Sequence, residues 1–557
     1  KLEQDVSKLE KSVQKSERER LDLERIHQKR ILEAEKRHLE VVWSISFRLG
    51  RLLTYPLRKP FVLFVLPSLE RHPFSHSLLR LLRAGIANPV RLKNLFSVWR
   101  VKRLLRLLIE RGSNAEAAFQ RYEDILKTDN RLITSAKISS AVDQNIAPEK
   151  ISLGVSAHPV VSVVIPVFNQ ISYTLNCLKS ISENLPNVPF EVIVVDDCSS
   201  DKTPELLCKI RGLRVLTNSS NLGFLRSCNV AVKSCKGQYI FLLNNDTRVT
   251  EDWLDALVRV FEHHEDAGIV GSKLVYPDGS LQEAGGIIWR DGSGWNYGRN
   301  EDPLLPEFNY LKKVDYISGA AILFRASWFR EIKGFDERFS PAYYEDTDLA
   351  FRAREGGAEV YYQPQSVIIH YEGKSHGLDE NAGVKKNQLI NQKKFVKKWS
   401  EVLHENHYEN GKQILSARER SGSKTTVLVI DHYVPLYDQD AGSRSTFQYL
   451  ELLVSAGCNV KFMGDNFFRH EPYTAELEAM GIEVLAGEYY RKHWKAWLES
   501  NSSYVDIVYL MRPHVAQKYL EELSSLNEKP KLIYFGHDLH YLRLQRKAEL
   551  ERSQRVE

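Results

Sequence analysis

Residues 190–201 read FEVIVVDDCSSD, a run of apolar and β-branched residues that ends in adjacent acids. Such a run predicts a strand that is buried on both faces. Further strands are predicted at 160–166 (VVSVVIP), 213–217 (LRVLT) and 238–246 (QYIFLLNND), and helices near 172–184, 203–210 and 224–235. Strands that alternate with helices predict an α/β fold with a mostly parallel sheet.

Polar residues stand at the ends of these predicted strands. Asn169 follows the first strand, Asp196 and Asp197 end the second, and Asp246 ends the fourth. Ligands of parallel sheets bind beyond the carboxyl ends of the strands, so these residues are candidates for a binding site. One of the paired acids could instead cap the helix that begins near Thr203, although two consecutive acids exceed what a cap needs.

An ordered set of motifs extends this pattern over about 220 residues, from 159 to 377. The motifs are VSVVIPVFN (161–169), EVIVVDDCSSD (191–201), NLGFLRSCN (221–229), FLLNNDT (241–247), YISGAAILFR (316–325), GFDERF (334–339), YYEDTDLAFR (343–352) and IIHYEG (368–373). Together they resemble the family 2 glycosyltransferases, which have the GT-A nucleotide-diphospho-sugar transferase fold. The resemblance implies transfer of a sugar from a nucleotide diphosphate to an acceptor hydroxyl, with inversion at the anomeric carbon.

The resemblance also implies which residues bind the donor. Asp196 and Asp197 would hold the nucleoside, because carboxylates at a strand end can accept hydrogen bonds from ribose or base. The full expected donor set is Pro166, Asn169, Asp196, Asp197, Arg226, Asn245 and Gly319.

FLLNNDT stands where the family has an Asp-x-Asp metal motif, but Asn244 replaces its first acid and leaves Asp246 as the one carboxylate. A divalent cation that also binds a diphosphate needs only one or two carboxylates from the protein. By resemblance, His370 is a further metal ligand, and an imidazole suits Mn²⁺ better than Mg²⁺ without excluding either. An ordinary Asn-Asp turn and a structural histidine are the alternatives.

YYEDTDLAFR carries the expected catalytic residues. Transfer requires a base within hydrogen-bond reach of the acceptor hydroxyl. By family position this base is Asp346, with Glu345 beside it, and repulsion between adjacent carboxylates can raise the pKa of one of them. Asp348 and Arg352 are expected to form an internal pair.

The stretch GGIIWRDGSGWNYGRN (285–300) combines glycines with aromatic residues. Glycine permits motion, and aromatic faces suit the apolar faces of sugars. We expect an acceptor-side flap that carries Trp289, Trp295 and Tyr297, with a plain surface loop as the alternative.

The remaining chain divides by composition. We expect a charged helix or coiled coil at 1–40, basic amphipathic helices at 41–150, the GT-A domain at 156–405, a polar linker at 406–423, and a second α/β unit at 424–557. The last unit resembles the Rossmann-like amino-terminal half of a GT-B glycosyltransferase, through IDHYVPLYDQDAGSRS (430–445) and HDLHYLR (537–543).

Charge is distributed unevenly. Residues 48–111 hold 14 Lys or Arg against two acids, whereas the whole chain has a net charge of +5. Basic amphipathic helices favour contact with an anionic membrane surface, and a helical subdomain packed on the next domain is the alternative. Nucleic acid is not expected as a partner, because the aromatic residues accompany the apolar stripe. Self-association through the coiled coil is possible, since the apolar heptad lasts about two repeats.

Six scattered cysteines fit a reducing compartment rather than a disulfide scaffold. No signal peptide is visible, and the longest apolar run, 61–67, is too short to span a bilayer. We therefore expect a cytoplasmic hexosyl or deoxyhexosyl transferase, peripheral at the inner membrane face, that uses a UDP- or dTDP-sugar to extend a saccharide or lipid-linked saccharide of a surface polysaccharide. The alternative is a membrane-tethered scaffold with an inactive transferase domain.

Overall fold

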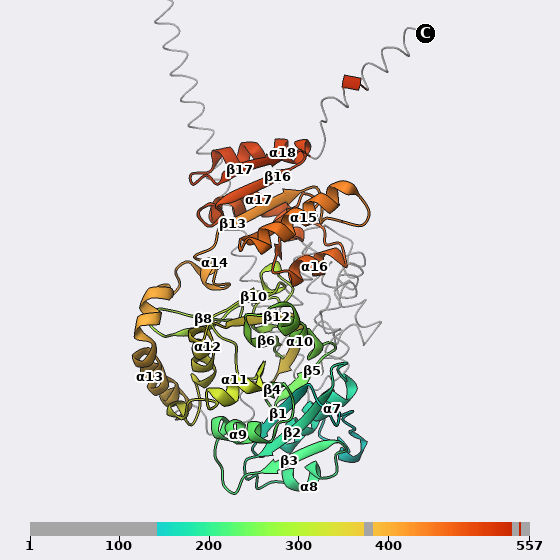
Figure 1. Cartoon of the computed structure of the whole chain (residues 1–557), viewed down its shortest axis with the longest axis vertical. Helices are drawn as coiled ribbons and strands as arrows, with labels where there is room; N and C mark the ends of the chain where they lie inside the picture. Colours follow the sequence, from blue (N-terminus) through green and yellow to red (C-terminus); the bar gives the residue numbers. More distant parts are fainter. Residues whose placement is uncertain (1–141, 373–382, 537–544, 547–557) are drawn as a thin grey trace, which may run out of the picture. The chain divides into compact units, whose positions relative to one another are not determined.

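The structure is a computed structural model that describes residues 142–372, 383–536 and 545–546 (Figure 1). The helix or coiled coil expected at 1–40 lies outside the described residues, as do all but residues 142–150 of the basic helices expected at 41–150. Among the helices that the structure describes, none combines the length and apolar composition needed to cross a membrane.

Four parallel strands begin the larger sheet, as the sequence predicts. They are β1 (Val161–Val167), β2 (Phe190–Asp196), β3 (Leu213–Thr217) and β4 (Tyr239–Leu243). Strand β1 pairs with both β2 and β4, and β2 pairs with β3, all in parallel register. Every side chain of β2 is buried, which explains its continuous apolar composition.

The rest of this ten-stranded sheet is mixed, so the prediction of a mostly parallel sheet is wrong for this part. Its strands are β5 (Thr247–Val249), β6 (Ala267–Val275), β7 (Leu281–Glu283), β10 (Lys312–Lys313), β11 (Ala321–Arg325) and β12 (Glu359–His370). Strand β11 lies between β4 and β6 and is antiparallel to both, whereas β12 is parallel to β6. A buried strand has the same apolar composition in either direction, so sequence patterning does not reveal its orientation. A separate hairpin joins β8 (Gly286–Ile288) to β9 (Gly294–Asn296).

Helices cover both faces of the larger sheet and connect its strands. The helices are α7 (Ile171–Glu183), α8 (Thr203–Leu207), α9 (Phe224–Ala231), α10 (Asp255–His263), α11 (Ala326–Glu331), α12 (Glu345–Glu355) and α13 (Gly383–Asn406), with short 3₁₀ turns η2 (Pro148–Lys150), η3 (Val232–Ser234), η4 (Pro306–Phe308) and η5 (Glu337–Phe339). The helices expected near 172–184, 203–210 and 224–235 are thus confirmed as α7, α8 and α9.

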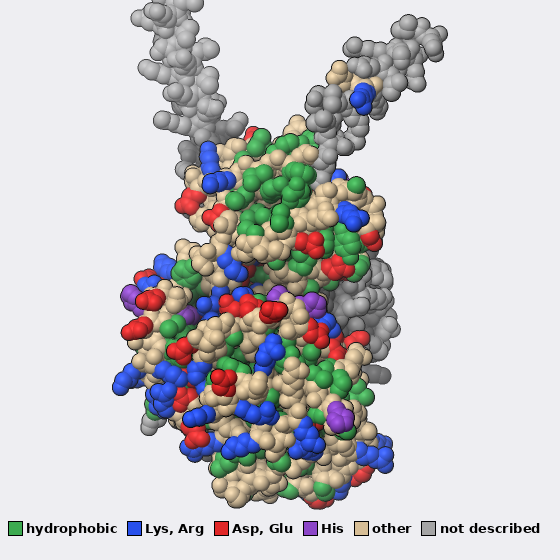
Figure 2. All heavy atoms as spheres, in the orientation of Figure 1, with side chains coloured by type: hydrophobic (Ala, Val, Ile, Leu, Met, Phe, Trp, Pro, Cys, Tyr) green, Lys and Arg blue, Asp and Glu red, His purple; other side chains and the backbone are tan. Residues whose placement is uncertain are grey.

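A second, five-stranded sheet follows, and all its strands are parallel. Its order is β15 (Glu483–Val484), β14 (Asn459–Gly464), β13 (Thr426–Asp431), β16 (Ile507–Met511) and β17 (Lys531–Phe535). The accompanying helices are α15 (Ala441–Ser455), α16 (Tyr473–Ala479), α17 (Glu488–Asn501) and α18 (Pro513–Ser525), with the 3₁₀ turn η6 (Ser502–Tyr504). Apolar side chains gather over α18 and β17 in Figure 2, where Leu520, Leu532, Ile533 and Tyr534 are exposed.

The polar stretch 406–423 differs from the expected linker. It contains the short helix α14 (Ile414–Ala417), and the side chains of Arg418, Glu419 and Ser421 are buried. Charged residues are typical of exposed linkers, but here buried partners of opposite charge compensate them.

Asp348 and Arg352 form the internal pair that the sequence predicts. Asp348 Oδ2 lies 2.9 Å from Arg352 Nε, and the Asp348 side chain is fully buried. Asp348 Oδ1 lies 2.7 Å from Lys398 Nζ and accepts a hydrogen bond of 2.8 Å from Trp399 Nε1. This carboxylate therefore holds α12 against α13.

Asp348→Ala should lower the free energy of unfolding by about 3–5 kcal/mol, because it leaves two partly buried cations without their common partner. Urea denaturation followed by tryptophan fluorescence measures the change. Glu205→Ala is the matched control, since Glu205 and Lys209 form an exposed pair with the same four-residue spacing. It should have no measurable effect, and equal losses in the two variants would contradict the role of burial.

Candidate active site

Asn169 joins the loops that follow β1 and β2. Its side-chain Oδ1 accepts hydrogen bonds from the main-chain N–H groups of Ser200 (2.8 Å) and Asp201 (3.2 Å). Its own N–H donates to Ser199 Oγ at 2.7 Å. Asn169 has a φ of 56°, a left-handed conformation that asparagine tolerates better than most residues. The predicted donor residue thus shapes the loop beside the paired acids.

Asp196 and Asp197 have different surroundings. Asp197 accepts three hydrogen bonds from the 218–223 loop, each 2.8 Å long, from Asn218 Nδ2, Leu222 N and Gly223 N. Asp196 is fully buried, its Oδ1 accepts from Ser199 N–H at 3.0 Å, and its Oδ2 has no hydrogen-bond partner among the described residues. Buried polar atoms normally have partners, so Asp196 retains capacity for a ligand, whereas Asp197 organises its loop.

Asp246 and His370 lie side by side, as the sequence reasoning requires. Asp246 follows β4 and His370 ends β12, with 3.2 Å between His370 Nε2 and Asp246 Oδ1. Both side chains are buried. Gln282 Oε1 lies 3.1 Å from the other ring nitrogen, Nδ1. An amide oxygen can only accept, so Nδ1 carries a proton, and in a neutral ring Nε2 presents its lone pair to the carboxylate.

This pair fits a divalent cation. A lone pair and a carboxylate oxygen that face each other at 3.2 Å need a proton or a cation beside them. One imidazole and one carboxylate suit Mn²⁺, and Mg²⁺ would accept the same oxygen, with the diphosphate providing further ligands. Within 142–372 and 383–536, no group of three or more His, Cys, Asp or Glu side chains is arranged to hold a metal ion. The described residues therefore offer two candidate metal ligands at this place, Asp246 and His370.

Helix α12 begins abruptly at Glu345. The two preceding residues, Tyr343 and Tyr344, have φ values of 76° and 70°, a strained conformation for bulky side chains. Asp346, in the first turn, then meets the turn before β11, where its Oδ2 accepts a hydrogen bond of 2.9 Å from Gly319 N–H. The structure thus brings the expected base together with the expected donor-loop glycine.

Burial changes the acidity of both carboxyl groups at the start of α12. Burial, and then the neighbouring Asp346, raise the pKa of Glu345 to about 8. Burial also raises the pKa of Asp346, although the N–H groups of Gly319 and Thr347 oppose this by stabilising its charge. A carboxylate with a raised pKa is a stronger base toward a hydroxyl proton.

Glu283 is a third buried acid at this place, and the sequence reasoning missed it. It ends β7, its side chain is fully buried, and it accepts a hydrogen bond of 3.0 Å from Ser318 N–H. Its Oε2 has no hydrogen-bond partner among the described residues. Burial raises the pKa of Glu283 to about 8, and the charge of Asp346 adds to the effect. The only signal in the sequence was a polar pair, Gln282–Glu283, before two glycines, which is common in surface turns.

Strand β7 links the two halves of the site. Gln282 contacts His370 beside Asp246, and the next residue, Glu283, binds the turn that also holds Asp346. Alternate strand residues point to opposite faces, so one strand of three residues can serve both groups.

The other residues expected to bind the nucleotide-sugar donor make ordinary structural contacts. Pro166 is half-buried in β1. Asn245 is buried and donates from Nδ2 to Thr174 Oγ1 at 3.1 Å. Arg226 is exposed on α9 and donates from Nε to Glu337 Oε2 at 3.0 Å. Asn244 stands at the variant motif position. Its main-chain carbonyl accepts a hydrogen bond of 2.6 Å from Thr247 Oγ1, and this bond closes the turn after β4.

The aromatic loop agrees only in part with the expected acceptor flap. Trp289 is fully buried against Ile287 and Ala417, so the prediction that its ring faces an acceptor is wrong. Tyr297 is half-buried, and its hydroxyl donates to Glu307 Oε1 at 3.3 Å. Trp295 is 40% exposed and is the one of the three aromatic residues that presents a ring to solvent.

Part of this chain is similar to known glycosyltransferases. Residues 162–333 match the family model for Glycosyl transferase family 2. The O-antigen biosynthesis protein RfbC of Myxococcus xanthus is 28% identical over 232 residues, which are 40% of this chain and 18% of that protein. The N-acetylglucosaminyl-diphospho-decaprenol L-rhamnosyltransferase of Mycobacterium tuberculosis is 25% identical over 218 residues, 34% of this chain and 69% of that protein.

The crystal structure of GalNAc-T7 with UDP, GalNAc and Mn²⁺ is similar over 45% of this chain and 50% of that chain, at 15% identity and a TM-score of 0.37. The chain spans 25%, 18% and 50% of the length of the first three curated relatives that it matches.

Glu283→Gln should change how stability depends on pH. Because the pKa values of Glu283 and Glu345 are raised to about 8, the folded chain binds their protons more tightly than the unfolded chain. This stabilisation is present below the ordinary carboxyl pKa and is lost as the pH rises through about 8. Glutamine mimics the protonated acid, so the variant should lose less stability than the wild type between about pH 5 and pH 8, by a few kcal/mol.

Urea denaturation at pH 5, 6.5 and 8 measures this difference. Glu262→Gln, a change at an exposed acid on α10, is the control and should follow the wild type. Parallel pH curves for Glu283→Gln and the wild type would contradict the buried, protonated state of Glu283.

Proposed function

We propose that residues 156–405 form an inverting, metal-assisted glycosyltransferase. It moves a sugar from a UDP- or dTDP-sugar to a hydroxyl of a growing, lipid-linked surface polysaccharide. The observation that carries this proposal is the shared support of the two halves of the site. Adjacent N–H groups, of Ser318 and Gly319, bind Glu283 and Asp346, while Gln282 contacts His370 beside Asp246.

The donor side comprises Asp196 and the Asp246–His370 pair. The unpartnered Oδ2 of Asp196 accepts a hydrogen bond from the nucleoside, and Asp246 and His370 hold Mn²⁺ or Mg²⁺. When bound, the cation offsets the negative charge of the diphosphate and so assists its departure. Asn244 does not supply a second carboxylate, so the diphosphate would supply more of the cation's oxygen ligands than with a two-acid motif.

The acceptor side centres on Asp346. The acceptor hydroxyl oxygen forms a bond to the anomeric carbon, its proton passes to an Asp346 carboxylate oxygen, and the bond to the nucleotide diphosphate breaks. Burial raises the pKa of Asp346, which suits it to take this proton. The N–H of Gly319 holds the carboxylate in place. Glu345, the neighbour of Asp346, is neutral while it keeps its proton, so it then adds no negative charge beside the base.

Two relatives support the acceptor class, since one is named for O-antigen biosynthesis and another for transfer to a decaprenol-linked saccharide. The basic composition of 48–111 supports a peripheral position at the cytoplasmic membrane face, close to such a lipid. The parallel order of β13–β17 supports a Rossmann-like unit that resembles one half of a GT-B glycosyltransferase.

Asp346→Asn and Asp246→Asn should impair different steps, the first catalysis and the second donor binding. Asp346→Asn preserves shape but cannot accept a proton, so transfer should fall by about 10²–10⁴ while donor affinity barely changes. Asp246→Asn should weaken donor binding first. Hydrolysis of UDP- and dTDP-sugars with Mn²⁺ measures turnover, and calorimetry with UDP measures binding. Full activity of Asp346→Asn together with loss in Glu345→Gln would move the base to Glu345. Full activity of both variants would contradict a carboxylate base at this place, and a wild type without turnover would favour the scaffold alternative.

Binding of UDP or dTDP should require a divalent cation, and His370→Ala should weaken it by about 10–100-fold, the usual scale for a disturbed metal shell. Calorimetry with Mn²⁺ and with EDTA measures both effects. His263→Ala is the matched control, because this histidine is exposed on α10 and its Nδ1 lies 2.7 Å from Arg259 O of the same helix. Equal affinity with and without the cation would contradict the metal assignment.

A further inference from the structure

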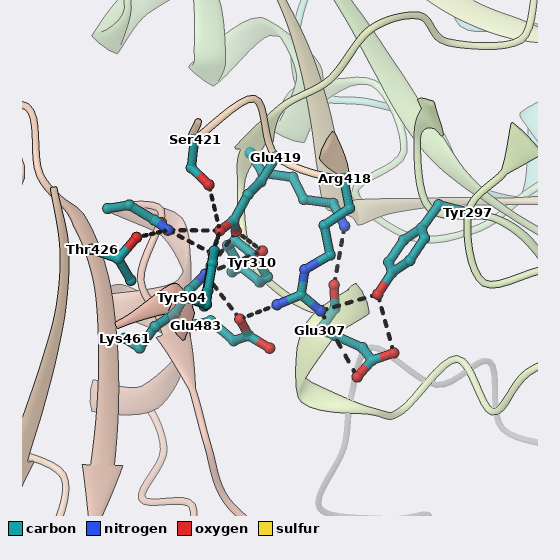
Figure 3. Close-up of polar contacts among 12 residues, drawn as sticks. Tyr297, Glu307, Tyr310, Arg418, Glu419, Ser421, Thr426, Lys461, Glu483 and Tyr504 are labelled. Atoms are coloured by element: carbon teal, nitrogen blue, oxygen red, sulfur yellow. Dashed lines mark hydrogen bonds and ion pairs between the residues drawn. The ribbon is translucent and has the colours of Figure 1, made fainter. Parts of the chain in front are cut away.

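A buried cluster of charges joins the 418–419 segment to the five-stranded sheet and to the loops of the larger sheet (Figure 3). Arg418, Glu419, Lys461 and Glu483 form its core, and each has a side-chain exposure of 3% or less. Two cations and two anions therefore balance one another away from water. Removing one member of such a cluster leaves an uncompensated buried charge, which is strongly destabilising.

Glu419 is the centre on the side of the five-stranded sheet. Its carboxylate lies 2.7 Å from Lys461 Nζ and accepts a hydrogen bond of 2.7 Å from Asn459 Nδ2, and both partners belong to β14. The hydroxyls of Tyr310 and Tyr504 also donate to it. These donors stabilise the charged form and lower the pKa of Glu419 in spite of its burial.

Arg418 extends the cluster toward the aromatic loop. Its Nη2 donates to Glu483 Oε2 at 2.6 Å, and its Nη1 donates to the Tyr297 hydroxyl at 3.0 Å. The planar guanidinium can make both bonds at once because its donors point in fixed directions. Lys312 Nζ lies 4.7 Å from the centre of the Tyr297 ring, so basic side chains contact both the hydroxyl and the ring.

Tyr297 is in turn bonded to the segment that carries the active-site residues of β7. Its main-chain N–H donates to Gly285 O at 3.0 Å, and its carbonyl accepts from Ala284 N–H at 2.9 Å. Gln282, Glu283 and Ala284 are consecutive residues. A continuous path of bonds therefore runs from Glu483 in β15, through Arg418 and Tyr297, to the residues beside Asp346 and His370.

We propose that Arg418 and Tyr297 are positioning residues for the transferase site, through which the five-stranded sheet holds Gln282 and Glu283 in place. The five-stranded sheet is then part of the transferase rather than an independent binding unit. Neither residue touches the reacting atoms; each acts through the 284–285 main chain. The role in turnover rests on the proposed function, but the mechanical link does not.

Tyr297→Phe tests the link, because it removes one hydroxyl and leaves the Arg418–Glu483 pair intact. Hydrogen exchange of the full chain should show faster exchange in the peptide containing 281–300, with β1 and β2 unchanged. Arg418→Lys keeps a charge beside Glu483 but cannot make both bonds, and it should have the same local effect. Mn²⁺-dependent UDP binding should weaken by about 2- to 30-fold in both variants, the usual range for coupling through a network.

Tyr504→Phe is the matched control, since it also removes a hydroxyl from the cluster but contacts Glu419 rather than the aromatic loop. It should leave exchange at 281–300 and UDP affinity as in the wild type. Unchanged exchange at 281–300 in Tyr297→Phe, or an equal increase in Tyr504→Phe, would overturn the proposal. If the wild type itself does not bind UDP with Mn²⁺, the proposed function fails, while the exchange result still decides the link.

Discussion

The arrangement of the candidate site depends on two successive main-chain N–H groups. Ser318 and Gly319 donate to Glu283 and Asp346, and so hold two buried carboxyl groups close together where their charges repel. In water, two such carboxylates would move apart and be hydrated. Here the fixed N–H donors hold them in place. Proton binding by Glu283 and Glu345 relieves the repulsion, which leaves Asp346 as the carboxylate whose charge is best compensated. The proposed division between Asp346 as the base and its protonated neighbours thus follows from where the N–H donors point.

Much of the larger sheet could be predicted from the sequence, because β1, β2 and β4 are buried strands that end in polar residues. The pairing of Asp246 with His370 was expected from the family resemblance rather than from a local pattern, and the structure places the two side chains 3.2 Å apart. Strand direction could not be predicted, and β11 reverses it between β4 and β6. Glu283 was missed because burial of an acid depends on how β7 pairs with β6, which no local pattern shows.

The aromatic loop shows the opposite failure. Trp289, Trp295 and Tyr297 share a glycine-rich sequence, but the β8–β9 hairpin sends them to different environments. Trp289 packs beside α14, Trp295 reaches solvent, and Tyr297 bonds Arg418. The composition of the segment does not show which aromatic side chains are buried. That depends on the face of the hairpin to which each side chain points.

The buried 418–419 segment also has a consequence for how the chain can be divided. Its polar composition marks 406–423 as a natural place to separate the two sheets for expression. A cut after Glu419 would leave Arg418 and Glu419 on one fragment and Lys461 and Glu483 on the other, each without its counter-charges. The two fragments would then have to recombine, or else admit water into their newly exposed surfaces. A cut before Arg418 would keep the four charges together but would separate them from Tyr297 and Tyr310. The junction is thus a shared interior, and the position of a cut decides which buried groups lose their partners.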